Sequence, residues 1–86
     1  MIEVEIADQS AVAHARRCAV DLAAQIGWGE TDRGRVALVA TELATNVLKH
    51  AGRGLLLAQI SDESVDLLAL DQGDGIGDLP ASMRDG

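Results

Sequence analysis

The spacing of apolar residues changes along the chain, and each change marks a different predicted element. Residues 2–6 alternate between apolar and acidic side chains, which predicts a strand with one buried face. From residue 10 to residue 26 apolar side chains recur every three or four positions, with polar residues on the opposite side. This spacing predicts an amphipathic helix that Asp8 or Ser10 caps at its start and that ends at Gly27.

A second helix follows a short glycine-rich connector. It is predicted to begin at a cap on Thr31 or Asp32 and to end at Gly52. Gly34 in its first turns costs up to about 1 kcal/mol of helix stability relative to alanine, so packing must compensate for it. The indole of Trp28, between two connector glycines, is expected to pack back over the helix pair.

Two apolar runs of strand length, residues 55–60 and 65–70, are separated by the polar residues 61–64, a stretch suited to a hairpin loop. We expect these runs to pair as antiparallel strands. Both are almost continuously apolar, so each should be covered on both faces, and no element for the second cover is evident. The pattern predicts an α/β chain of the α+β two-layer sandwich type, with helices packed on one face of a mixed sheet.

Length and composition limit the class of protein. The 86 residues make one small domain or part of one. Hydrophobic residues make up 48% of the sequence, and Trp28 is the only aromatic one among them. A thin core of small side chains is therefore expected. The net charge of −7, with seven lysines and arginines in all, argues against a nucleic-acid partner. A bound nucleotide is compatible with this charge, because magnesium and backbone amides can neutralise its phosphates.

The single cysteine and the hydropathy of the chain exclude further classes. Cys18 has no partner for an internal disulfide or a cysteine-based zinc site. The first residues lack the basic start and the long apolar run of a secretory signal. No apolar run approaches the roughly 20 residues that span a bilayer. We therefore expect a cytoplasmic protein with no membrane segment.

The segment from Thr41 to His50 carries the first candidate site. With about 100° per residue, Asn46 lies about 40° and Lys49 about 20° around the helix axis from Glu42, so these three share a stripe beside the buried face. An amide oxygen can join a Mg²⁺ shell, a lysine can meet a phosphate oxygen, and a glutamate can orient or deprotonate an attacking hydroxyl. A merely solvated helix surface is the competing interpretation.

A second candidate site follows the last predicted strand, at residues 71–78, Asp-Gln-Gly-Asp-Gly-Ile-Gly-Asp. Asp71 can accept a hydrogen bond from an exocyclic amine such as that of adenine, and the glycines permit close backbone approach, although a plain turn competes. A calcium EF-hand would need an oxygen ligand at Gly73 and a glutamate at Ser82. A dinucleotide fingerprint would need glycine at Asp78, and no Gly-Lys-Ser/Thr phosphate loop occurs.

Together and in this order, the two segments resemble the motifs of the GHKL ATPase family, whose members bind Mg-ATP in a Bergerat fold. Residues 42–50, Glu-x-x-x-Asn-x-x-Lys-His, look like its N box, and residues 71–77, beginning Asp-x-Gly-x-Gly, look like its G1 box. The resemblance covers nearly the whole chain. Within the family, the sequence is most similar to the small anti-sigma-factor and switch-protein serine kinases. It implies ATP and Mg²⁺ as cofactors and a STAS-domain or sigma-factor-like protein as partner.

Carried over residue by residue, the resemblance implies specific roles. Glu42 would be the catalytic acid or base, Asn46 would hold Mg²⁺, and Lys49 would touch a phosphate. Asp71 would bind the adenine amine. The other residues assigned to the nucleotide, of which the first two would shape the adenine pocket, are Gly73, Gly75, Ile76, Gly77 and His50.

The family pattern continues past this sequence into a flexible ATP lid, a second glycine-rich G2 box and further strands. We therefore expect residues 1–86 to form a single partial ATP-binding domain with an incomplete Bergerat-type fold. Nucleotide binding should be weak or undetectable, with no turnover. The uncovered sheet edge and apolar face predict self-association into a homo-oligomer.

Four hypotheses about function follow. The leading one is an ATP-dependent serine/threonine kinase of the anti-sigma type that acts on a STAS-domain partner, represented here by its N-terminal part. The alternative is a non-catalytic module that binds a sigma-factor or STAS-like regulator through its helical surface. The ATPase domain of a sensor kinase would need an upstream helix pair with a phosphoacceptor histidine, for which residues 1–9 leave no room. A simple packing domain with a solvated stripe is the fourth.

Overall fold

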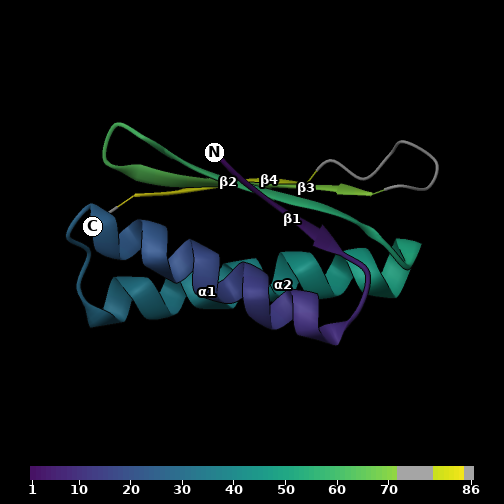
Figure 1. Cartoon of the computed structure of the whole chain (residues 1–86). Coiled ribbons are helices and arrows are strands. Elements are labelled where there is room, and N and C mark those ends of the chain that lie inside the picture. The colour runs from purple at the N-terminus through teal and green to yellow at the C-terminus, as the bar shows by residue number, and fades with distance from the viewer. Residues whose placement is uncertain (72–78, 85–86) are drawn as a thin grey trace.

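Two helices lie side by side on one face of a β-sheet (Figure 1). The computed structural model describes residues 1–71 and the backbone of residues 79–84. The predicted α+β two-layer sandwich is confirmed. The elements in chain order are β1 (Ile2–Ile6), α1 (Gln9–Gln25), α2 (Glu30–Ala51), β2 (Gly54–Ser61), β3 (Ser64–Asp71) and β4 (Leu79–Arg84).

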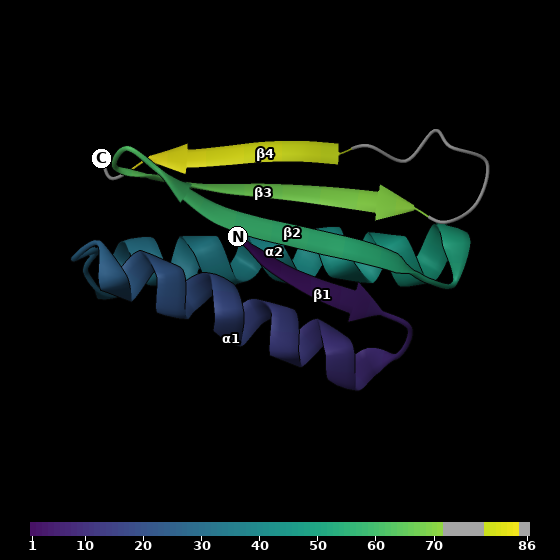
Figure 2. The same cartoon turned by 45° about the horizontal axis from the view of Figure 1, so that its top comes forward.

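The sheet has the order β1-β2-β3-β4, and each of its pairs in the described part of the chain is antiparallel (Figure 2). The prediction of a mixed sheet is therefore wrong. A parallel pair needs a crossover that returns the chain to the start of the first strand. Here two successive helices run out and back, so Gly54 pairs with Ile6 and β2 runs opposite to β1.

The edge strand β4 has no counterpart among the predicted elements. Its sequence contains Pro80, which lacks a backbone N–H and argues against a central strand. An edge strand tolerates proline, because only one side of its backbone pairs with a neighbour. In the structure β4 pairs with β3 alone, with Pro80 opposite Leu68.

The first helix begins where the sequence predicts. Asp8 is its N-cap, and its Oδ1 accepts hydrogen bonds from the Ser10 hydroxyl at 2.6 Å and from the Ala11 N–H at 3.0 Å. These bonds, the Ser10 one foremost, lower the pKa of Asp8 below its ordinary value of 3.8. Gly27, just past the helix end, has a φ of +82°, a conformation that glycine adopts at no steric cost.

The second helix begins earlier than predicted. Its N-cap is Gly29, which makes no side-chain capping bond, so the assignment of the cap to Thr31 or Asp32 is wrong. Both of these residues lie inside the helix. The carboxylate of Asp32 in the first turn stabilises the helix, because its negative charge lies near the positive end of the helix dipole. The predicted end is confirmed, because Gly52 has a φ of +79° and its N–H donates to two carbonyls of the last turn.

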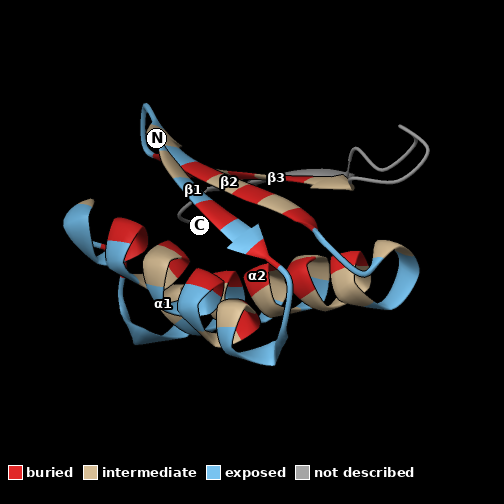
Figure 3. Ribbon diagram, turned by 45° about the vertical axis from the view of Figure 1, so that its right-hand side comes forward, coloured by how far each residue is buried: buried red, intermediate tan, exposed pale blue. Residues whose placement is uncertain are grey.

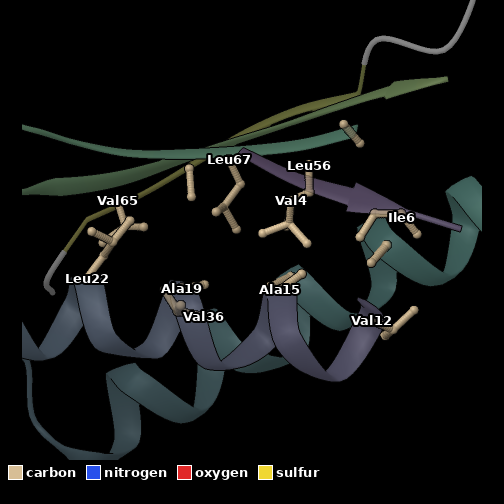
Figure 4. Close-up of a cluster of buried hydrophobic side chains, with 14 of the residues drawn as sticks. Val4, Ile6, Val12, Ala15, Ala19, Leu22, Val36, Leu56, Val65 and Leu67 are labelled. Carbon is tan, nitrogen blue, oxygen red and sulfur yellow. The ribbon is translucent and has the colours of Figure 1, made fainter. Parts of the chain in front are cut away.

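The core lies between the helical layer and the inner face of the sheet (Figures 3 and 4). Small residues dominate the helical side, which lets the helices lie close together, as the composition predicts. Trp28 is buried with 4% exposure and belongs to this core, as expected of an indole that packs back onto the helices. The buried helical residues are Val12, Ala15, Ala19, Leu22, Ala23, Val36, Ala40, Ala44 and Val47.

The outer face of the sheet carries a second apolar surface, which we name the leucine face. It consists of two cross-strand pairs, Leu55 with Leu70 and Leu57 with Leu68, all partly exposed. Both helices lie on the opposite face, so no described helix covers these leucines (Figure 1). The predicted second cover is thus not among the described elements. No helix within the described residues is long and apolar enough to cross a bilayer.

Candidate functional site

The stripe predicted at residues 41–50 lies in the second half of α2. Glu42 and Lys49 are exposed and Asn46 is half-buried, while Val47 beside them has no exposed surface. Val47 points into the core, so the neighbouring Asn46 lies at the boundary between the buried face and solvent. The helix therefore presents an amide at the rim of the core and two charged groups outside it.

These polar side chains have no partners within the described part of the chain. No hydrogen bond or ion pair there involves the side chain of Glu42, Asn46 or Lys49. Other polar groups are paired: Thr41 donates to the Ala37 carbonyl at 2.7 Å, and an Arg53 guanidinium nitrogen lies 3.0 Å from a Glu5 carboxylate oxygen. The stripe thus keeps its hydrogen-bonding capacity available for a ligand.

Asp71 is the last residue of β3 and lies on the helix-facing side of the sheet. Side chains alternate along a strand, and Asp71 has the same parity as the buried residues Val65, Leu67 and Ala69. It is half-buried, and no hydrogen bond or ion pair within the described residues involves its side chain. Its carboxylate therefore extends the inner face of β3 beyond the apolar core.

A close contact between α2 and the sheet brings the two predicted sites near each other. Gly54 pairs with Asp71 across β2 and β3. A Cβ built on Gly54 would come within 2.8 Å of Val47 Cγ1, so Val47 lies directly over this end of the sheet. Because Asn46 adjoins Val47, the helix stripe and Asp71 belong to the same end of the molecule and the same side of the sheet.

The rest of the predicted G1 box cannot be compared with this geometry. Gly73, Gly75, Ile76 and Gly77 lie outside the described residues. His50, which follows Lys49 at the end of the N box, is exposed in the last turn of α2. The roles assigned to these residues therefore stay predictions.

The described residues contain no group of three histidine, cysteine or acidic side chains that could hold a metal by themselves. Mg²⁺ on a nucleotide keeps several waters and uses few protein ligands, so it does not need such a group. A single half-buried amide oxygen at Asn46 is the kind of ligand such an ion takes. The donor set at this end of α2 is thus compatible with a nucleotide-borne magnesium.

Gly54 is a residue that the sequence pattern did not single out. The predicted strand begins one residue later, and Gly54 reads as part of the turn Gly-Arg-Gly that follows α2. The structure places it at the start of β2, buried between Val47 and the carbonyl of Leu70. A glycine at the first position of an apolar strand was the one available signal, since it often marks close backbone approach.

A family profile described as "Histidine kinase-like ATPase domain" matches residues 6–86, and the chain belongs to this family. The serine/threonine-protein kinase RsbT of Bacillus subtilis (strain 168) is 32% identical over 87 aligned positions. That alignment covers 96% of this chain and 65% of the relative. No solved structure matches the chain.

Proposed function

We propose that the chain binds ATP with Mg²⁺ and is the ATP-binding part of an anti-sigma-type serine/threonine protein kinase in the cytoplasm. The observation that carries this proposal is the position of Asn46 and Asp71 on one side of the sheet, joined through the contact of Val47 with Gly54. Family membership and the similarity to a serine/threonine-protein kinase support it. A STAS-domain protein is the proposed acceptor of the phosphoryl group.

The residues present fit a Mg-nucleotide. Asn46 would hold the metal through its amide oxygen, and Lys49 would contact a phosphate oxygen as a point charge. The bound metal would offset negative charge on the phosphates. Asp71 would accept a hydrogen bond from the adenine amine. The remaining residues proposed for the nucleotide are His50, Gly73, Gly75, Ile76 and Gly77.

Glu42 is the proposed catalytic residue. Its carboxylate is exposed and has no partner within the described residues, so a serine or threonine hydroxyl of another protein can reach it. As the hydroxyl oxygen bonds to the γ-phosphorus, Glu42 takes the hydroxyl proton and the bond to the ADP leaving group breaks. Glu42→Gln should then stop phosphoryl transfer while nucleotide affinity stays near that of the wild type.

Calorimetric titration of Mg-ADP tests the proposal most directly. The chain spans 65% of RsbT, so the titration uses both this chain and a version lengthened to match the relative. We expect tighter binding, and turnover, in the lengthened version. Absence of binding in both versions would remove the nucleotide function.

The variant Asn46→Ala tests the metal role. Its loss of a half-buried amide should abolish Mg-ADP binding with a change in unfolding free energy within about 0.5 kcal/mol. Gln59→Ala is the matched control, because Gln59 is an exposed amide on the outer face of β2. Retained affinity in Asn46→Ala, or equal loss in both variants, contradicts the assignment.

A second candidate function is a non-catalytic module that binds a sigma-factor or STAS-like regulator. Leu38, which is 59% exposed on the outer surface of α2, is the observation that favours it, because this apolar side chain is open to contact with another protein. Leu38 lies one turn before Glu42, so such a partner would cover the same helix surface. Capture of a purified STAS-domain protein without ATP, and loss of capture in Leu38→Ser, would favour this function.

Self-association through the leucine face is proposed as well. Four partly exposed leucines in two cross-strand pairs form an apolar surface that a second copy could cover. Sedimentation at increasing concentration should show a dimer or larger species. Leu57→Ser should shift the equilibrium toward the monomer, and a wild type that stays monomeric at every concentration contradicts the proposal.

A further inference from the structure

Gly54 is the middle one of three residues that pair across β1, β2 and β3, and the last of the three is Asp71 of the candidate site. It pairs with Ile6 of β1 on one side and with Asp71 of β3 on the other. Ile6 is fully buried, Gly54 is buried and Asp71 is half-buried, and the alternation of each strand directs all three toward the helices. Gly54 is therefore the central residue of the row that Asp71 borders.

The structure leaves no space for a side chain at Gly54. A Cβ there would lie 2.8 Å from Val47 Cγ1 and 3.2 Å from the Leu70 carbonyl carbon, and it would overlap the Leu70 carbonyl oxygen. Real Cβ atoms essentially never come within 3.0 Å of another heavy atom. Val47 has no exposed surface and a short branched side chain, so it cannot move aside without moving α2.

The two groups that a methyl would displace adjoin the two candidate ligand residues. Val47 immediately follows Asn46 in α2, and Leu70 immediately precedes Asp71 in β3. A displacement of Val47 also displaces the helix turn that bears Asn46. A push on the Leu70 carbonyl moves the peptide unit that leads into Asp71. The same methyl thus acts on both sides of the proposed nucleotide site.

We propose that Gly54 is a positioning residue that sets the spacing between Asn46 and Asp71. It acts by letting Val47 rest on the backbone of β2 while β3 stays in register beside it. This inference rests on the proposed function, because the spacing between Asn46 and Asp71 matters only if both residues bind the same nucleotide. Gly34, in α2, shows the contrast, because a Cβ there meets nothing within 4 Å.

The test compares Mg-ADP affinity in variants that differ in where they disturb the core. Gly54→Ala should weaken binding about tenfold or more in the version that binds nucleotide, because displacements of about 1 Å have large effects on such sites. Leu22→Ala disturbs the core at a position where no site residue lies, so it controls for lost stability. It should keep wild-type affinity when both are measured well below their unfolding temperatures.

Rescue separates positioning from simple loss of packing. In Gly54→Ala/Val47→Ala the shorter residue 47 removes the clash with Val47 Cγ1 and leaves the overlap with the Leu70 carbonyl oxygen. The double variant should therefore lose less affinity than the losses of the two single variants added together. Val47→Ile enlarges the helix side chain at the same contact. It replaces Gly54→Ala in the affinity measurement if Gly54→Ala does not fold. Equal affinities in Gly54→Ala and wild type, or a loss shared with Leu22→Ala, would overturn the inference.

A readout without nucleotide keeps this test apart from that of the function. Amide resonances of the Asn46 side chain and the Asp71 backbone should both shift in Gly54→Ala and stay in place in Gly34→Ala. If the wild type binds no nucleotide in either length, the proposed function fails, and shifted resonances still support the spacing role. Unshifted resonances overturn that role whatever the nucleotide result.

Discussion

The two halves of α2 differ in how their side chains are used. In residues 30–40 the polar groups have local partners or face open solvent. Arg35 lies 3.4 Å from the Asp32 carboxylate one turn away, and a side chain at Gly34 would meet nothing. This half is a covering helix whose sequence constraints are those of an amphipathic element.

The second half brings a close approach to the sheet backbone together with a half-buried amide that has no partner within the described residues. Val47 lies against the bare backbone of Gly54, and Glu42, Asn46 and Lys49 keep their hydrogen-bonding groups free within the described residues. The half-buried amide of Asn46 keeps its contact with solvent, since no described side-chain nitrogen or oxygen is buried without a partner. The difference teaches that one continuous helix has a half that only covers the sheet and a half that carries the residues proposed to bind the nucleotide.

Two buried valines, one in each half, give the largest test of this comparison. Val36 and Val47 are both fully buried, so replacement of either by alanine should lower the unfolding free energy by about 2 kcal/mol. Only Val47→Ala loosens the turn that bears Asn46. We expect Mg-ADP affinity to fall in Val47→Ala and to be unchanged in Val36→Ala, with denaturant unfolding and calorimetry as the measurements.

A result in which both valine variants lose affinity in step with their stability would break the comparison. In that case the two halves of α2 would support binding equally, through the general stability of the core. The measurement needs a temperature at which both variants are fully folded, because an unfolded fraction lowers apparent affinity by itself.

The open position in the first half predicts a gain in stability. Gly34→Ala should raise the unfolding free energy by up to about 1 kcal/mol, since alanine is the better helix former and its methyl meets no atom within 4 Å. Thermal unfolding checks this. The opposite sign is expected for Gly54→Ala, so a destabilised Gly34→Ala would show that the first half is also under a packing constraint.

The starts of the two helices predict the smallest effect, a difference in acid sensitivity. Because its hydrogen bonds lower the pKa of Asp8 in the folded chain, the unfolded chain binds more protons at this group. The stabilisation is therefore complete above the ordinary value of 3.8 and is lost as the pH falls through the lower folded pKa. The N-cap of α2 is Gly29, which makes no side-chain capping bond and so adds no dependence of stability on pH.

The variant Asp8→Asn isolates this contribution. Asparagine can still accept the Ala11 N–H bond but does not titrate. Between about pH 5 and about pH 2 its unfolding free energy should fall less steeply than that of the wild type. Identical slopes in the two proteins would mean that the cap does not contribute to acid sensitivity.

Local sequence pattern was sufficient for much of the fold. The period of the apolar residues predicted both helices and strands β1, β2 and β3, because burial of one face sets a repeat of 3.6 or 2. Asp8, Gly27 and Gly52 marked helix ends because capping depends on neighbours in the chain. The stripe of Glu42, Asn46 and Lys49 followed from helix geometry alone.

Only the tertiary structure decided how these elements meet. The predicted antiparallel hairpin of β2 and β3 is confirmed. The pairing of β1 with β2 and its direction depend on where the two helices return the chain, which no residue pattern states. The edge strand β4 forms despite Pro80, because β3 offers it a free edge. The contact of Val47 with Gly54, on which the proposed spacing of Asn46 and Asp71 rests, joins residues from a helix and a strand. This contact is possible because Gly54 has no Cβ. The sequence alone does not reveal that role, because it depends on which atoms lie next to Gly54 in the folded chain.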